Sequence, residues 1–230
     1  MLRTLIKYCK NCGTAVLYRV PDDGDTKERA VCPLCHTIHY ENPLIVVGTV
    51  PYWGDKVLLC KRNIEPRFGK WTLPAGFMEL NETVAEGASR ETLEESGAQF
   101  ELEDFFSLLN VPRVGQVHLF YRARLLNDVF KPGFETIETR LFSESEIPWN
   151  ELAFKTVMET LKHYFADRRS GQPSPEHVAL TGEDQRWIAR QRRDGRREGL
   201  CIGPHGLLGS GQVTPGIKAR DDIRAGVDSG

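Results

Sequence analysis

Short runs of apolar and β-branched residues, separated by turn residues, predict a β-sheet in the middle of the chain. Residues 44–50 and 56–61 are two such runs, and the Trp-Gly-Asp stretch that begins at Trp53 is typical of a hairpin turn between them. A loop with a short strand is expected at residues 68–74. Further strands are predicted by the apolar character of three later segments, residues 105–111, 116–125 and 140–142.

Two stretches carry helical signals instead. Thr83 can cap a helix whose first turn holds Glu86, and Gly97 suits the left-handed position that ends a helix. Residues 148–168 repeat apolar side chains near helical spacing, at Leu152, Val157, Leu161 and Phe165. Strands that are split by one helix and closed by another predict an α/β fold over residues 42–169, with a mixed sheet sandwiched between helices.

Four of the six cysteines form two Cys-x-x-Cys pairs near the N-terminus, Cys9 with Cys12 and Cys32 with Cys35. Two such pairs, nineteen residues apart, match the spacing of a zinc ribbon, in which four thiolates close a tetrahedron around Zn²⁺. Because no coordination position stays open in such a site, the zinc is expected to be structural. We assign residues 1–41 to this ribbon.

Other interpretations of the cysteines remain open. The pairs can form a disulfide framework, although such frameworks are typical of secreted chains. His36 and His39 lie beside the second pair and can replace a cysteine as a zinc ligand. Cys60 lies in an apolar run and is expected to be plain core, whereas Cys201 has no evident partner.

Length and charge narrow the class of protein. The chain has 230 residues, enough for one ordinary core and one small module. Its formal net charge of −2 gives no reason to expect nucleic acid or an anionic membrane as a partner. No apolar run approaches the roughly 18 residues that span a bilayer, and the N-terminus lacks a signal-like segment. We therefore expect a cytoplasmic protein without a membrane partner.

The composition changes after about residue 170. Glycine becomes frequent, apolar residues lose their periodicity, and arginines gather at Arg190, Arg192, Arg193, Arg196 and Arg197. These arginines can contact phosphate or RNA, or they can belong to a solvated tail. We favour the second interpretation and predict a disordered Gly/Arg-rich tail over residues 170–230.

The helix predicted after Thr83 carries a cluster of carboxylates. Glu91, Glu94 and Glu95 are spaced i, i+3 and i+4, so they share one face of the helix. Like charges this close repel, so such a face is either well solvated or holds a divalent cation. Oxygen ligands suit a hard ion such as Mg²⁺ or Mn²⁺, which keeps waters and takes substrate phosphates as further ligands.

The residues around this cluster resemble the Nudix box, the loop–helix–loop signature of hydrolases that cleave nucleoside diphosphates linked to another group. The resemblance covers residues 76–98, GFMELNETVAEGASRETLEESGA, with every fixed Gly, Glu and Arg of the pattern at its spacing. Thr92 and Ala98 depart from the pattern, because larger aliphatic residues are more usual there. The resemblance implies the Nudix α/β/α fold.

It also implies a catalytic magnesium site, whose ligands would be Glu91, Glu94, Glu95 and the backbone carbonyl of Ala75. Arg90 would hold the neighbouring carboxylates by paired hydrogen bonds, with Glu82 in a supporting role. Nudix enzymes often recruit a further Glu from a loop beyond the box, as base or extra ligand. Glu138 is preferred for this part, and Glu135 is the alternative. Many members of the family are homodimers, so a homodimer is expected here.

The substrate is expected to be a small dinucleotide. A ribbon before the box resembles the NADH pyrophosphatase group, but residues 99–104, QFELED, replace the Ser-Gln-Pro-Trp-Pro-Phe-type segment of that group. Residues 9–168 are more similar to a bacterial and plant subgroup linked to FAD and ADP-ribose, which implies hydrolysis to AMP and a second monophosphate. Arg62, Phe68 and Trp71 are candidate substrate contacts. The alternatives are NADH or NAD-capped RNA as substrate, or a non-catalytic nucleotide- or RNA-binding module.

Overall fold

The computed structural model describes residues 5–171 and the backbone of residues 177–180. The N-terminal part is a small antiparallel sheet with the strand order β1-β2-β3, where β1 spans Leu17–Arg19, β2 Arg29–Val31 and β3 Ile38–His39. Residues 5–41 contain no helix to pack on these strands, so the ribbon needs another source of stability.

The larger part is built on an eight-stranded sheet. Six of its strands follow the order β10-β5-β4-β9-β8-β11, and the other two pair beside them, β6 with β5 and β7 with β4. The strands are β4 (Leu44–Trp53), β5 (Lys56–Arg62), β6 (Trp71–Thr72), β7 (Ala75–Phe77), β8 (Phe100–Val111), β9 (Gln116–Leu125), β10 (Thr136–Phe142) and β11 (His177–Leu180). The sheet is mixed, because β4 runs parallel to β9 and β11 parallel to β8, while the other pairs are antiparallel.

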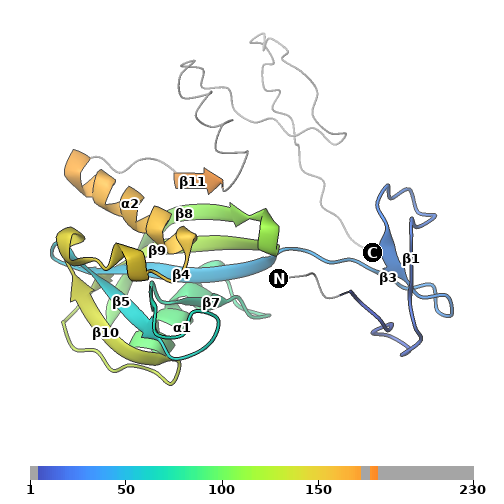
Figure 1. Ribbon diagram of the computed structural model, residues 1–230, viewed down its shortest axis with the longest axis horizontal. Coiled ribbons are helices and arrows are strands. Elements are labelled where there is room, and N and C mark those ends of the chain that lie inside the picture. Colours follow the sequence, from blue (N-terminus) through green and yellow to red (C-terminus); the bar gives the residue numbers. More distant parts are fainter. Residues whose placement is uncertain (1–4, 172–176, 181–230) are drawn as a thin grey trace, which may run out of the picture. The chain divides into compact units, whose positions relative to one another are not determined.

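Two α-helices lie on opposite sides of this sheet, α1 (Val84–Ser96) and α2 (Lys155–Ser170) (Figure 1). Three short 3₁₀ helices complete the connections, at Pro112–Val114, Glu144–Glu146 and Trp149–Glu151. The predicted α/β fold, a mixed sheet between helices, is therefore confirmed. Within the described residues, no helix combines the length and the apolar character that crossing a bilayer requires.

The main core lies between the sheet and α2. Its central side chains are fully buried and come from strands and helix alike: Val50, Leu59, Leu73, Leu109, Phe120, Val157 and Leu161. On the other side α1 packs on β4 through small side chains. The hydroxyls of Thr49 and Thr92 lie 2.7 Å apart in this buried contact. A larger aliphatic residue in place of Thr92 would lose that hydrogen bond, which accounts for one departure from the family pattern.

Several element boundaries differ from those expected. β8 begins at Phe100 rather than residue 105, because Phe100 pairs with Leu125 at the end of β9. β10 begins at Thr136 rather than residue 140. α2 begins at Lys155 rather than residue 148, since the preceding residues form the 3₁₀ helix Trp149–Glu151 and Ala153 then donates its N–H to the carbonyl of Trp71.

The structure also places β11 inside the segment expected to lack regular structure. Its four residues pair with Ser107–Asn110 of β8, where the edge of the sheet offers unpaired backbone groups to a short apolar run. The prediction of a disordered tail is therefore wrong for residues 177–180. Ser170 and Gly171, at the start of that segment, end α2, and residues 172–176 and 181–230, including the arginine cluster and Cys201, lie outside the described residues.

Candidate active site and zinc ribbon

Local signals position α1. Thr83 caps the helix through a reciprocal pair of hydrogen bonds, in which Glu86 N–H donates to the Thr83 hydroxyl at 3.2 Å and Thr83 N–H donates to the Glu86 carboxylate at 2.7 Å. Gly97 ends the helix with φ of 62° and donates its N–H to the carbonyl of Leu93. Both ends therefore lie where the sequence predicts them.

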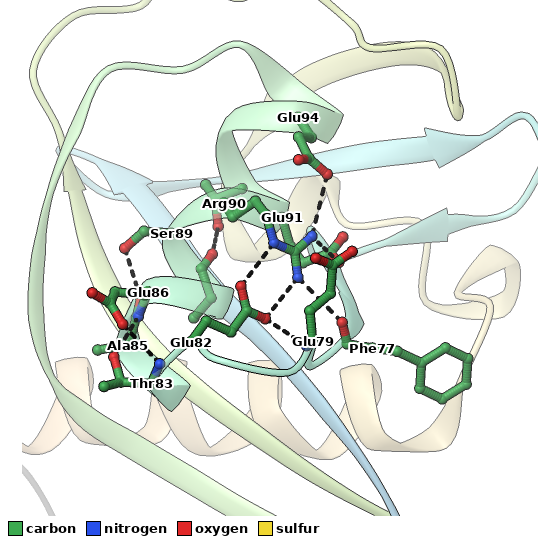
Figure 2. Close-up of polar contacts among 12 residues, drawn as sticks. Phe77, Glu79, Glu82, Thr83, Ala85, Glu86, Ser89, Arg90, Glu91 and Glu94 are labelled. Carbon is green, nitrogen blue, oxygen red and sulfur yellow. Dashed lines mark hydrogen bonds and ion pairs between the residues drawn. The ribbon is translucent and has the colours of Figure 1, made fainter.

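Arg90 lies at the centre of the carboxylates (Figure 2). Its guanidinium makes a bidentate contact with Glu82 at 2.9 and 2.8 Å, and further contacts with Glu91 at 2.7 Å and Glu94 at 3.3 Å. It also donates to the backbone carbonyl of Phe77 at 3.2 Å. The planar fork of an arginine can satisfy so many acceptors at once, whereas an ammonium cannot. Arg90 thus joins the loop before α1 to the acidic face of the helix.

Glu82 is a fixed partner of this network. It accepts the two hydrogen bonds from Arg90 and a third from the backbone N–H of Glu79 at 2.7 Å. The Arg90 guanidinium, followed by that N–H, lowers the pKa of Glu82 to about 2. Its carboxylate is therefore ionised and already satisfied, which fits the supporting role implied for it.

Glu91 lies against the backbone of β7. A Cβ placed on Gly76 would come within 2.3 Å of the Glu91 carboxylate, so any larger residue at position 76 would displace this carboxylate from its place. The side chain is 13% exposed, and this burial raises the pKa of Glu91 in spite of the neighbouring Arg90.

Glu95 is the most buried of the acids. The residue is 7% exposed, and its carboxylate accepts one hydrogen bond from the backbone N–H of Ala75, at 3.1 Å. Burial raises the pKa of Glu95 to about 8; the Ala75 N–H and Arg62 oppose the rise, and the charges of Glu91 and Glu135 add to it. A buried carboxyl among like charges is a position that a cation would stabilise.

Glu94 differs from its neighbours, since its side chain is 59% exposed and accepts one long hydrogen bond, from the Arg90 guanidinium at 3.3 Å. In the described part of the chain, the carboxylate oxygens of the acidic face do not converge to within 4.8 Å as the ribbon thiols do. The donor set still fits a hard divalent cation, because all donors are oxygens and, among the described residues, Glu95 forms no ion pair and is offset only in part by Arg62.

A loop between β9 and β10 brings a fourth acid to this face. Gly133 donates its N–H to the carbonyl of Glu95 at 3.1 Å, and a Cβ on Gly133 would lie 1.8 Å from the carbonyl oxygen of Glu94. The adjacent Glu135 raises the pKa of both Glu91 and Glu95 by its charge. Glu138 lies further along β10, opposite Lys61 of β5. The geometry therefore favours Glu135 over Glu138 as the additional acid.

The three candidate substrate contacts differ in their exposure and in their neighbours. Trp71 is 6% exposed and packs edge-on against Phe142, with ring centroids 4.9 Å apart, so it belongs to the core and not to a substrate surface. Phe68 is 58% exposed in the loop after β5. Arg62 lies over the ring of Phe154 at 5.2 Å and acts electrostatically on Glu95. Arg62 and Phe68 therefore remain candidates for substrate contact.

The ribbon cysteines converge as a metal site requires. The Sγ atoms of Cys9 and Cys35 lie 3.6 Å apart, and Cys12 lies 3.5 Å from both Cys32 and Cys35. A tetrahedron with Zn–S bonds of about 2.3 Å has edges of about 3.8 Å, so the four thiols fit zinc. All four are free thiols, which argues against the disulfide interpretation.

The two knuckles provide the thiolates with donors. Asn11 and Cys35 each donate a backbone N–H to the first sulfur of their knuckle at 3.4 Å, and hydrogen bonds with Thr37 lower the pKa of Cys35 to about 5. His36 occupies the left-handed turn position with φ of 58°, as Gly13 does in the first knuckle with φ of 76°. His36 is thus a turn residue, and the four cysteines complete the site without either histidine.

Loss of zinc is expected to unfold the ribbon and to spare the sheet domain, which has its own core. Cys35→Ser should lower the bound zinc from one equivalent to less than about 0.2, because one ligand of a closed site is lost. Metal analysis and the dispersion of the ribbon NMR signals measure this. Cys60→Ala is the matched control, since Cys60 is buried in β5 away from the ribbon and should retain full zinc. Full zinc content in Cys35→Ser would contradict the four-cysteine assignment.

A cavity of about 560 Å³ elsewhere has no part in this site. It lies beside the end of α2 and is lined by Asp55, Ser143, Glu144, Ser145, Phe165, Arg168 and Arg169. Its arginines are already engaged, Arg169 with Glu144 and Arg168 with the hydroxyl of Tyr164. None of the acids of α1 lines it.

Comparison with known proteins agrees with this geometry. A family model described as NUDIX domain matches residues 43–191, and a zinc-ribbon model described as Nudix N-terminal matches residues 7–41. Among solved structures, a NUDIX hydrolase from Nitrosomonas europaea is 51% identical, with 76% of this chain and 98% of that chain covered and a TM-score of 0.73.

Curated relatives are more distant. NAD-capped RNA hydrolase NudC from Stutzerimonas stutzeri is 28% identical over 175 residues, which are 74% of this chain and 59% of that protein. The chain thus spans about three fifths of the length of this relative. An ADP-ribose pyrophosphatase from Methanocaldococcus jannaschii is 31% identical over 122 residues, which are 50% of this chain and 69% of that protein.

Proposed function

This chain belongs to the NUDIX family, and from that premise we propose that it hydrolyses the pyrophosphate bond of an ADP-linked nucleotide, FAD or ADP-ribose, with the help of a divalent cation. The observation that carries the proposal is the buried carboxyl of Glu95. It lies beside Glu91, has one hydrogen bond from Ala75 N–H, and lacks a compensating cation among its direct contacts. A protein that kept these acids only for solubility would leave them in water.

The residues that would hold the cation are Glu91, Glu94, Glu95 and the backbone carbonyl of Ala75. Mg²⁺ or Mn²⁺ in this position would neutralise phosphate charge and lower the pKa of a bound water. Glu94 would have to turn away from Arg90 to join the set, and its exposed side chain is free to do so. Glu82 and Arg90 would not bind the cation but would keep the acidic face in place.

We propose Glu135 as the additional acid of the site, which acts either as the base or as an additional ligand of the cation. As base, it would accept a proton from the attacking water. The oxygen of that water would bond to one phosphorus while the bond from that phosphorus to the bridging oxygen breaks. The bonding electron pair leaves with the second phosphate, so the products are AMP and the other monophosphate. Glu135 is positioned for this part because its loop packs against the end of α1.

Arg62 and Phe68 would contact the substrate. Arg62 lies at the end of β5, where its guanidinium already acts on Glu95 and can also pair with a phosphate. The exposed ring of Phe68 offers a surface on which a nucleobase or flavin can stack.

A second candidate substrate is NAD-capped RNA, because several curated relatives carry the name NAD-capped RNA hydrolase NudC. Two observations weigh against it. Residues 99–104 lack the motif of the NADH pyrophosphatase group, and part of this stretch forms the start of β8 against β9. The net charge of −2 provides no general attraction for RNA.

The deciding experiment is a substrate panel with the purified protein and Mg²⁺. FAD, ADP-ribose, NADH, NAD⁺, diadenosine polyphosphates, nucleoside triphosphates and a short NAD-capped RNA would be compared by AMP or RNA-monophosphate release. We expect kcat/KM for FAD or ADP-ribose to exceed the others by at least about tenfold, with no release in EDTA. Preference for NADH or capped RNA would select the second candidate. Tight binding without turnover would identify a nucleotide sensor.

We further propose that the protein acts in the cytoplasm as a homodimer. Zinc-binding thiols are typical of a reducing compartment. Sedimentation of the full chain tests the dimer, and a single species at the monomer mass would reject it.

A further inference from the structure

Two loops of different origin meet beside the acidic face of α1. One follows β5 and begins with Asn63, and the other connects β9 to β10 and ends with Glu135. Asn63 donates twice across the junction, from its backbone N–H to the carbonyl of Glu135 at 2.8 Å and from its side-chain amide to the carbonyl of Phe134 at 3.0 Å.

The positions of these two carbonyls matter for Glu135. The carbonyl of Phe134 belongs to the peptide group that precedes the Glu135 Cα, and the carbonyl of Glu135 belongs to the group that follows it. Hydrogen bonds to both carbonyls restrain the two peptide planes, and so restrain the φ and ψ angles of Glu135 and the direction of its Cα–Cβ bond. One residue therefore restrains the backbone from which this carboxylate projects.

The rest of the loop is held from the opposite side. Lys131 donates its N–H to the carbonyl of Ser96 at 2.9 Å, and Gly133 donates to the carbonyl of Glu95 at 3.1 Å. A further turn closes between Thr136 N–H and the Gly133 carbonyl at 3.1 Å. The loop thus lies between two supports, the end of α1 and Asn63, and Glu135 lies nearest to Asn63.

We infer that Asn63 is a positioning residue, which holds the Glu135 carboxylate toward Glu91 and Glu95 without touching the substrate itself. The inference rests on the proposed function for its kinetic consequence, but the structural part stands on the two hydrogen bonds. Asn63 is exposed and does not belong to the core, so replacing it by alanine removes the side-chain hydrogen bond to the Phe134 carbonyl and little apolar packing, while the backbone hydrogen bond to Glu135 remains.

The test compares Asn63→Ala with Asn127→Ala in the full chain with Mg²⁺ and the preferred substrate of the panel. Asn127 is the matched control, because its amide makes a similar hydrogen bond, to Gln99 at 2.9 Å, at the other end of the same loop. We expect Asn63→Ala to lower kcat about fivefold to tenfold with KM changed less than about twofold. Asn127→Ala should match the wild type.

The same replacement in a Glu135→Gln background separates positioning from a general loss of structure. If Asn63 acts through Glu135, adding Asn63→Ala to Glu135→Gln should lower kcat by less than about twofold further, because the carboxylate is already gone. An unchanged fivefold to tenfold loss in that background would overturn the inference, as would wild-type kcat in Asn63→Ala.

Amide hydrogen exchange provides a readout that does not depend on turnover. Exchange of the Gly133 and Thr136 amides should become at least about fivefold faster in Asn63→Ala and stay unchanged in Asn127→Ala. Unchanged exchange in Asn63→Ala would overturn the inference even if no substrate were found. Absence of turnover in the wild type together with faster exchange would reject the proposed function and keep the structural role of Asn63.

Discussion

Replacing Glu95 by glutamine is expected to lower Mg²⁺-dependent kcat on the order of 1000-fold. The amide keeps the size of the side chain and one acceptor for the Ala75 N–H, but it cannot supply the negative charge that a divalent cation requires. Steady-state kinetics over a range of Mg²⁺ concentrations measure the loss. Glu101→Gln is the matched control, because Glu101 pairs with Arg124 in an exposed contact and should leave kcat unchanged.

The same replacement should stabilise the metal-free protein at alkaline pH. The pKa of Glu95 is about 8 in the folded chain against an ordinary 4.5, so the folded state binds more protons than the unfolded state between these values. The free energy of unfolding in EDTA should therefore fall as the pH rises from about 4.5 to about 8, on the order of 5 kcal/mol in all. Glu95→Gln has no proton to lose and should not show this decline.

Added Mg²⁺ should offset the decline in the wild type, since a cation replaces the proton on Glu95, and it should leave the stability of Glu95→Gln unchanged. Denaturant titrations at pH 5 and pH 8, with EDTA or with Mg²⁺, provide the comparison. Equal stability of wild type and Glu95→Gln at pH 8 in EDTA would show that burial does not raise the pKa of Glu95. Unchanged turnover in the variant would remove Glu95 from the ligand set.

Features that depend on neighbours in the sequence could be predicted. The ends of α1 follow from Thr83 and Gly97, because a capping hydrogen bond and a left-handed residue act within one helical turn. The two cysteine knuckles follow for the same reason, since each pair lies on one tight turn. The shared face of Glu91, Glu94 and Glu95 needs only helical periodicity.

Features that depend on packing could not be predicted in this way. The indole of Trp71 could stack on a substrate, but in the structure it packs in the core against Phe142, which lies seventy-one positions later in the sequence. The choice between Glu135 and Glu138 depends on the loop before β10, whose Gly133 contacts the end of α1, while Glu138 pairs with Lys61 of β5. β11 pairs with a strand nearly seventy residues earlier, and its short apolar run carries no local signal for that partner.

Two glycines have a structural role that the sequence pattern alone does not reveal. Gly76 and Gly133 each leave room that a Cβ would fill, one for the Glu91 carboxylate and the other for the Glu94 carbonyl. Gly76 is part of the family pattern, and its steric reason becomes clear only when Glu91 is in place. Gly133 follows Pro132 in a loop that reads as an ordinary turn, yet it determines how closely Glu135 can approach α1.

Replacing Arg90 by lysine is expected to lower kcat about 100-fold and to reduce Tm, although the charge is conserved. The guanidinium holds Glu82, Glu91, Glu94 and the carbonyl of Phe77 at once, and a single ammonium cannot reach these acceptors from one position. Glu91 should then lose its fixed place against Gly76, and a misplacement of about 1 Å in a ligand is enough for a loss of this size. Kinetics and thermal unfolding of Arg90→Lys measure both effects.

Arg124→Lys is the matched control, because Arg124 makes one exposed ion pair with Glu101 and no further contact of the kind that Arg90 makes to a backbone carbonyl. It should keep the kcat and Tm of the wild type. If Arg90→Lys behaved in the same way, the contacts of the fork would be dispensable, and positive charge alone would explain the presence of an arginine.

The dependence of stability on acid pH should show how much the ion pair between Arg90 and Glu82 contributes to the contacts of Arg90. The pKa of Glu82 is about 2 in the folded chain, below its ordinary 4.5, chiefly because of Arg90. The stabilisation from this pair is therefore complete above about pH 4.5 and is lost as the pH falls toward 2. The difference in stability between wild type and Arg90→Ala should shrink over that interval, since protonated Glu82 no longer distinguishes the two proteins. A difference that stays constant from pH 6 to pH 2 would show that Arg90 acts through packing and the Phe77 carbonyl instead of through Glu82.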